Sequence, residues 1–173
     1  MKLKSTLLVS ALALSGAAFA QTAAPAAPAP DYTLSFNVGA VTDYRYRGIS
    51  QSRNKPAVQG GIDFAHSSGF YLGTWASSIK WIKDGGGNAS AEIDVYGGYK
   101  GTAGAIGYDI GILTYQYPSH NLAISPNTTE IYGAGTYGPV TLKYSHATTN
   151  LFGFGNSKNS YYLDLSAFFD LGD

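Results

Sequence analysis

One alternating stretch, from Tyr32 to Arg47, limits what this chain can fold into more than any other feature. One parity is mostly apolar and comprises Tyr32, Leu34, Phe36, Val38, Ala40, Thr42, Tyr44 and Tyr46, whereas the other is polar and ends in Asp43, Arg45 and Arg47. Because successive side chains of a β-strand point to opposite faces, the pattern predicts a strand with one apolar and one charged face.

The length of this stretch favours a membrane-spanning strand. Strands of soluble sheets have about five or six residues, whereas a tilted strand needs about 9–11 to cross a bilayer. Tyr44 and Tyr46 then lie where an aromatic girdle meets the membrane interface, and Arg45 and Arg47 point into a watery interior beside Asp43.

The same alternation recurs along the rest of the chain, and each segment keeps its charged residues on one parity. We expect eight strands, at 32–48, 57–66, 70–82, 91–100, 105–117, 129–137, 140–149 and 160–170. In the third strand, Tyr71, Trp75, Ile79 and Trp81 form the expected outer parity, opposite Lys80, and this choice leaves Phe70 and Leu72 on the polar parity.

The connections between these segments also alternate. Residues 67–69, 101–104 and 138–139 form short turns, whereas 49–56, 83–90, 118–128 and 150–159 form long loops. Short turns on one side and long loops on the other are typical of a transmembrane barrel. The sequence therefore predicts an all-β, antiparallel up-and-down transmembrane β-barrel. A soluble β-sandwich also alternates, but it rarely has strands of this length.

The first residues predict export. Lys2 and Lys4 precede an apolar run from Leu7 to Ala18, and the small-x-small sequence at 18–20 is a cleavage signal. We expect a signal peptide at 1–20, an Ala/Pro-rich periplasmic tail at 21–31 and the barrel at 32–173. No later stretch offers 18 consecutive apolar residues, which excludes a helical membrane protein. The expected location is the bacterial outer membrane.

Composition supports this class. The charged fraction is 13%, about half that of soluble domains, while the chain holds 22 Gly, 14 Tyr and no Cys. Without Lys2 and Lys4, nine of the 11 basic residues remain against 11 acidic residues. This balance gives no reason to expect nucleic acid as a partner.

Several blocks resemble the TorF family, proteobacterial outer-membrane proteins classed as porins from their form. The resemblance rests on residues 37–39, 43–52, 56–61, 69–77, 92–99 and 161–164. It implies an outer-membrane β-barrel and says little about substrate. It also implies a final strand that ends in an aromatic residue, whereas this chain ends at Leu171-Gly172-Asp173. We therefore expect the eight strands to be part of a larger barrel, of about twelve strands, that is truncated at the C-terminus.

Two sets of candidate site residues follow from the parities. The expected lumen-facing residues are Asp43, Arg45, Arg47, Asp63, Glu92, Asp94, Lys100, Asp109, Glu130, Lys143 and Asp164. The expected girdle comprises Tyr44, Tyr46, Tyr71, Trp75, Trp81, Tyr99, Tyr144, Tyr161 and Phe169. The charges near Arg47 either select solutes or form an ion-pair network that braces the wall, and the sequence leaves both readings open.

The sequence predicts no enzyme, cofactor or metal site, because the three His residues are scattered and lie near no nucleophile motif. The leading hypothesis is passive diffusion of small hydrophilic solutes through the barrel. The alternative is a non-conducting structural or adhesive barrel that acts through its long loops. Expected partners are outer-membrane lipid, those solutes and the barrel-assembly machinery.

Overall fold

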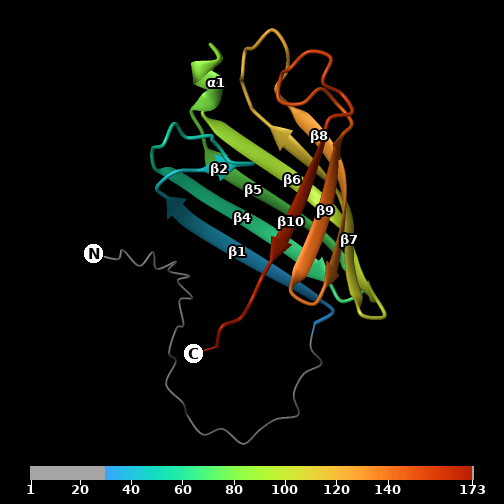
Figure 1. Cartoon of the computed structure of the whole chain (residues 1–173). Helices are drawn as coiled ribbons and strands as arrows, with labels where there is room; N and C mark the ends of the chain where they lie inside the picture. Colours follow the sequence, from blue (N-terminus) through green and yellow to red (C-terminus); the bar gives the residue numbers. More distant parts are fainter. Residues whose placement is uncertain (1–29, 173) are drawn as a thin grey trace, which may run out of the picture.

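Eight long strands follow one another through the protein and form one antiparallel sheet (Figure 1). The computed structural model describes residues 30–172, so the predicted signal peptide and nearly all of the predicted tail lie outside the described residues. The sheet strands are β1 (Tyr32–Val41), β4 (Ala57–His66), β5 (Phe70–Ser78), β6 (Ala91–Ala103), β7 (Ile106–Gln116), β8 (Thr128–Tyr137), β9 (Val140–Ala147) and β10 (Tyr161–Ala167).

The sheet is a meander in which each strand pairs with its neighbours along the chain, in the order β1-β4-β5-β6-β7-β8-β9-β10. The curved sheet is not closed, because no ladder joins β1 to β10 within residues 30–172. The prediction of an all-β antiparallel fold is confirmed. The larger barrel of about twelve strands stays a prediction.

The short turns lie at one end of the strands and the long loops at the other, as the sequence predicts. Three tight turns contain Gly69, Gly104 and Gly138, whose positive φ values of 104°, 61° and 55° suit glycine. The long loops gather at the other end, together with the short helix α1 (Trp81–Asp84) (Figure 1). None of the helices in the described part of the chain is long and apolar enough to cross a membrane.

The prediction of one strand from 32 to 48 is wrong, because β1 ends at Val41. The chain then forms a small hairpin of β2 (Arg45–Tyr46) and β3 (Ile49–Ser50). Arg47 and Gly48, at its tip, have φ values of 46° and 82°, and two consecutive positive values make the tight turn that suits a two-residue hairpin loop. We call residues 42–56 the hairpin loop.

The sheet has one apolar face and one polar face. The register aligns the inner-face residues Asn37, Gly61, Trp75, Asp94, Tyr115 and Thr128 in one row across six strands. Every charged residue of the eight strands lies on this inner face. The outer face is apolar yet exposed, for example at Phe36 (69%) and Val38 (85%). The third predicted strand has the opposite parity: Phe70 and Leu72 face outward, and Tyr71 and Trp75 face inward.

The buried core lies among the long loops, at the ends of the strands, and not between two layers. It comprises Ile79, Ile82, Ala89, Tyr115 and Tyr117, with Tyr44, Tyr46, Trp81, Leu113, Leu122 and Phe152 packed against it. The long loops are therefore folded over the end of the inner face.

Candidate functional site

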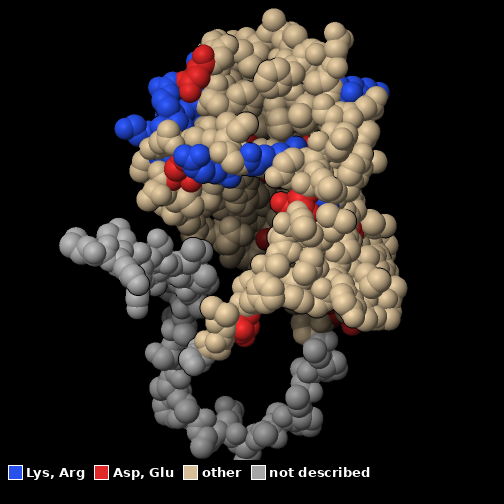
Figure 2. Space-filling view, in the orientation of Figure 1, with Lys and Arg blue, Asp and Glu red and all other residues tan. Residues whose placement is uncertain are grey.

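The hairpin loop lies across the inner face and is bound there at three points. The Tyr44 hydroxyl donates to Glu92 Oε1 at 2.5 Å, and the hydroxyls of Tyr46 and Tyr115 lie 2.6 Å apart. Arg47 Nη2 donates to Glu130 Oε2 at 2.8 Å. In the space-filling view, basic side chains form a band across the molecule above a hollow (Figure 2). Tyr44 and Tyr46 thus do not belong to an outer girdle, because their hydroxyls find partners on the inner face.

Glu92 is the first anchor of the hairpin loop. Glu92 is 2% exposed, and its Oε2 accepts a hydrogen bond of 2.6 Å from the Tyr117 hydroxyl. Burial, together with the nearby Glu92 carboxylate, raises the pKa of both Tyr44 and Tyr117. Both phenols therefore stay protonated, and they stabilise the buried carboxylate as hydrogen-bond donors.

Arg47 and Glu130 form the second anchor, with side chains that are 17% and 3% exposed. The Arg47 guanidinium also lies over the rings of Tyr46 and Tyr162, at 4.8 and 4.3 Å from their centroids. Burial, the largest single influence, lowers the pKa of Arg47, but the hydrogen bond to Glu130 and the electrostatic interactions with Tyr46, Glu130 and Tyr115 together outweigh it, and the pKa is raised. Of the two alternatives that the sequence left open for Arg47, solute selection or an ion pair that braces the wall, this contact fits the ion pair.

Asp43 and Arg45 lie at the base of the hairpin and pair with each other, Arg45 Nε being 2.8 Å from Asp43 Oδ2. Asp43 Oδ1 accepts hydrogen bonds from Ser50 Oγ at 2.5 Å and Ser52 Oγ at 3.0 Å. The Ser50 bond is the main cause that lowers the pKa of Asp43. These two charges shape the loop itself, whereas Arg47 reaches the sheet.

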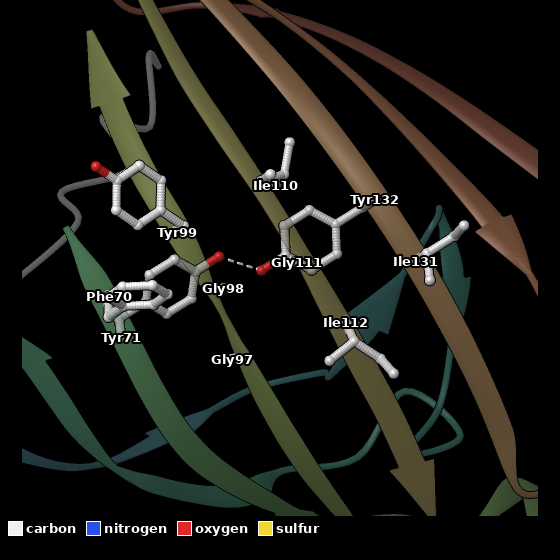
Figure 3. A pocket seen from close by; sticks show the side chains of 10 residues that line it. All are labelled: Phe70, Tyr71, Gly97, Gly98, Tyr99, Ile110, Gly111, Ile112, Ile131 and Tyr132. Carbon is white, nitrogen blue, oxygen red and sulfur yellow. Dashed lines mark hydrogen bonds between the residues drawn. The ribbon is translucent and has the colours of Figure 1, made fainter.

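Nearer the turns, the inner face holds a second polar cluster. The Tyr71 hydroxyl donates to Asp109 Oδ1 at 2.5 Å and also contacts the Tyr132 hydroxyl (Figure 3). Lys100 Nζ lies 4.4 Å from the centroid of the Tyr71 ring, and Lys143 Nζ lies 4.1 Å from that of Tyr132. The prediction of Tyr71 as a girdle residue is therefore wrong.

Glycines make room for these inward tyrosines. Gly98 lies opposite Tyr71, and Gly111 lies opposite Tyr132. A Cβ at Gly98 would lie 2.5 Å from the Tyr71 oxygen, and one at Gly111 would lie 2.5 Å from the Tyr132 oxygen. The two rings therefore lie flat over neighbouring strands that have no side chain at these points (Figure 3).

The remaining predicted lumen residues also lie on the inner face. Asp63 accepts a hydrogen bond of 2.5 Å from Tyr96, and Asp164 lies opposite Lys143. Asp94 is 8% exposed, and its Oδ1 has no hydrogen-bond partner among the described residues. Trp75 lies opposite Asp94 and packs edge-on against Tyr44, at 5.3 Å between centroids, so it is not a girdle residue.

The other girdle candidates divide between two places. Trp81 belongs to α1 and packs against Tyr117 and Phe152, which places it in the loop core. Tyr99, Tyr144 and Tyr161 lie on the outer face, and Phe169 is exposed just beyond β10. The predicted girdle also leaves out five outer-face aromatic residues near the turns, namely Tyr32, Phe64, Phe70, Tyr108 and Tyr137. Of these, only Phe70 was predicted on the polar parity.

Four tyrosines on or beside the inner face, none of them among the predicted site residues, are further functional candidates: Tyr96, Tyr115, Tyr117 and Tyr132. Tyr96 and Tyr132 share a strand parity with the nearby Asp94 and Glu130, which was the available signal. Among the described residues, no group of three or more His, Cys, Asp and Glu residues is placed to hold a metal ion.

Comparisons with known proteins give a family but no activity. No curated protein and no solved structure matches the chain. The model of a bacterial protein family of unknown function, Gcw_chp, matches residues 24–173. The match covers most of the sequence, and the chain belongs to this family.

Proposed function

We propose that this chain forms the wall of a bacterial outer-membrane barrel of the TorF type that lets small hydrophilic solutes diffuse passively. The observation that carries the proposal is the division of the sheet into an apolar exposed outer face and an inner face that holds all its charges. Figure 2 likewise shows large areas without charged side chains. Lipid solvates such an outer face, and water fills such an inner face.

The hairpin loop would then narrow the passage. It reaches from β1 to β8, and it adds Arg47 and two tyrosine hydroxyls to the inner face. Solutes would pass between this loop and the polar side chains of the sheet. Export by the predicted signal peptide and insertion by the barrel-assembly machinery belong to the same proposal.

A second candidate is a non-conducting barrel that acts structurally or in adhesion through its loops. The observation that favours it is the dense contact of the hairpin loop with Glu92, Tyr115 and Glu130, all of which are at most 3% exposed. In that case the anchors would seal the interior and hold the loops in a fixed arrangement.

Single-channel conductance in planar bilayers separates the two candidates. We expect stepwise conductance from the folded full-length protein, and a larger step when a short Gly-Ser turn replaces residues 44–51. No conductance from a folded sample, combined with conductance from the loop-replaced variant, would establish a sealed barrel and overturn the porin proposal.

A further inference from the structure

A pocket opens among the long loops, apart from the inner face of the sheet. Its cavity volume is about 360 Å³, within the range of roughly 300–1,000 Å³ common for small-molecule sites. Three segments far apart in the sequence line it: the hairpin loop with Arg47 and Ile49, α1 with Trp81, and the loop after β9 with Leu151, Phe152 and Phe154.

The walls of the pocket are apolar and largely aromatic. Phe152 packs edge-on against Tyr46 and Trp81, with ring centroids 5.7 and 6.4 Å away. Ile49 and Phe154 are 68% and 70% exposed. Unlike the outer face of the sheet, this apolar surface belongs to loops that would meet water, so a ligand that covers it would gain hydrophobic stabilisation.

One charged group lies in this apolar lining. Arg47 uses Nη2 for Glu130, whereas its Nε and Nη1 make no hydrogen bond with any described residue. The N–H groups on Arg47 Nε and Nη1 can donate two hydrogen bonds to the two oxygens of a carboxylate.

We propose that this pocket binds a small organic carboxylate, with its apolar or aromatic body between Phe152 and Phe154 and its carboxylate on Arg47. The apolar walls account for the body, and the unpaired Arg47 donors account for the charge. The inference goes beyond solute diffusion, because such binding needs the loops and not an open passage.

The first test compares two probes of one shape, 4-phenylbutyrate and 4-phenylbutan-1-ol. Calorimetric titration uses the full-length protein in lipid nanodiscs, with protein-free nanodiscs as the blank. We expect saturable binding of the carboxylate, at least about ten-fold tighter than that of the alcohol. A hydrogen bond to a charged group typically contributes more than the free energy that corresponds to a ten-fold change in affinity. Equal affinities, or no saturable binding of the carboxylate, would overturn the proposal.

Variants then locate the site. Phe154→Ser changes an exposed wall residue without disturbing the hairpin anchors, and we expect it to weaken phenylbutyrate binding by about ten-fold. Arg53→Gln removes a loop cation that pairs with Asp84 outside the pocket, so it should leave the affinity unchanged. Unchanged affinity in Phe154→Ser contradicts the proposed site. Saturable binding without conductance would contradict only the porin proposal. Conductance without saturable binding would contradict only the proposed carboxylate site.

Discussion

Arg47 and Glu130 are 83 positions apart in the chain, yet Arg47 Nη2 donates to Glu130 Oε2 at 2.8 Å. This ion pair ties the tip of the hairpin loop to β8. The opposite charges compensate each other where water is largely excluded, so the position of the loop depends on the pair remaining intact.

Removing the arginine should loosen the loop. We expect Arg47→Gln to lower the free energy of unfolding by an amount at the lower end of the roughly 3–5 kcal/mol typical of broken buried pairs, because Arg47 keeps some exposure. Arg45→Gln, which breaks an exposed pair at the hairpin base, should cost about 0–1 kcal/mol. Urea unfolding in detergent measures both. Equal losses would mean that the Arg47 pair does not hold the loop.

The two faces of the sheet can be compared at adjacent residues in the middle of β1. Phe36 lies on the outer face, and Ser35 lies on the inner face opposite Asp63. If lipid covers the outer face, Phe36→Arg should destabilise the protein by about 2–4 kcal/mol, whereas Ser35→Arg gains a carboxylate neighbour and should cost little. Folding in lipid vesicles, followed by heat-modifiable migration, reports the difference. Similar behaviour of the two variants would speak against a lipid-facing outer surface.

Gly98 tests the packing of the inward tyrosines. A Cβ there would collide with the Ile110 carbonyl and the Tyr71 hydroxyl, so Gly98→Ala should cost about 1–3 kcal/mol and displace Tyr71 from Asp109. A Cβ at Gly135 would meet no atom within 4 Å, and Gly135→Ala should be neutral or slightly stabilising. Chemical denaturation ranks the two variants. A stability loss in Gly135→Ala as large as that in Gly98→Ala would contradict the predicted collision.

Acid should loosen the base of the hairpin. The folded pKa of Asp43 is lowered, chiefly by the Ser50 hydrogen bond, so its stabilising effect is complete above the unfolded pKa of about 3.9. The effect is lost as the pH falls through the folded pKa. We expect the amides of Tyr44 and Asn54, which bond to Ser52 and Ser50, to exchange faster at pH 3 than at pH 6 after correction for intrinsic rates. Asp43→Asn should remove this dependence, and an unchanged pH profile in that variant would refute the assignment.

Charge alternation predicted most of the sheet because burial of a charged side chain in an apolar medium is costly, so each charged residue fixes the parity of its strand. The prediction for β4 matches its bounds of Ala57–His66. Strand β5 carries no charge between Phe70 and Ser78, and Lys80, which guided its predicted parity, lies beyond its end. Aromatic residues on both parities then gave no further guide.

The hairpin loop could not be predicted from alternation, because Tyr44 and Tyr46 suit a girdle and an interior equally well by hydrophobicity. Their direction is decided by partners far along the chain, since the Tyr44 hydroxyl meets Glu92 and that of Tyr46 meets Tyr115. Alternation describes neighbours within a strand and carries no information about contacts between a loop and a distant strand.

The meander also sets an order of assembly. Each ladder of the sheet joins strands that are consecutive along the sheet and along the chain, so the wall can grow one hairpin at a time with little loop closure at each step. The anchors of the hairpin loop lie on three successive strands: Glu92 on β6, Tyr115 on β7 and Glu130 on β8, the sixth strand of the sheet. The loop is therefore held at all three points only once β8 has joined the sheet. Complete docking of the hairpin loop therefore requires that the strands up to β8 have paired in the correct register.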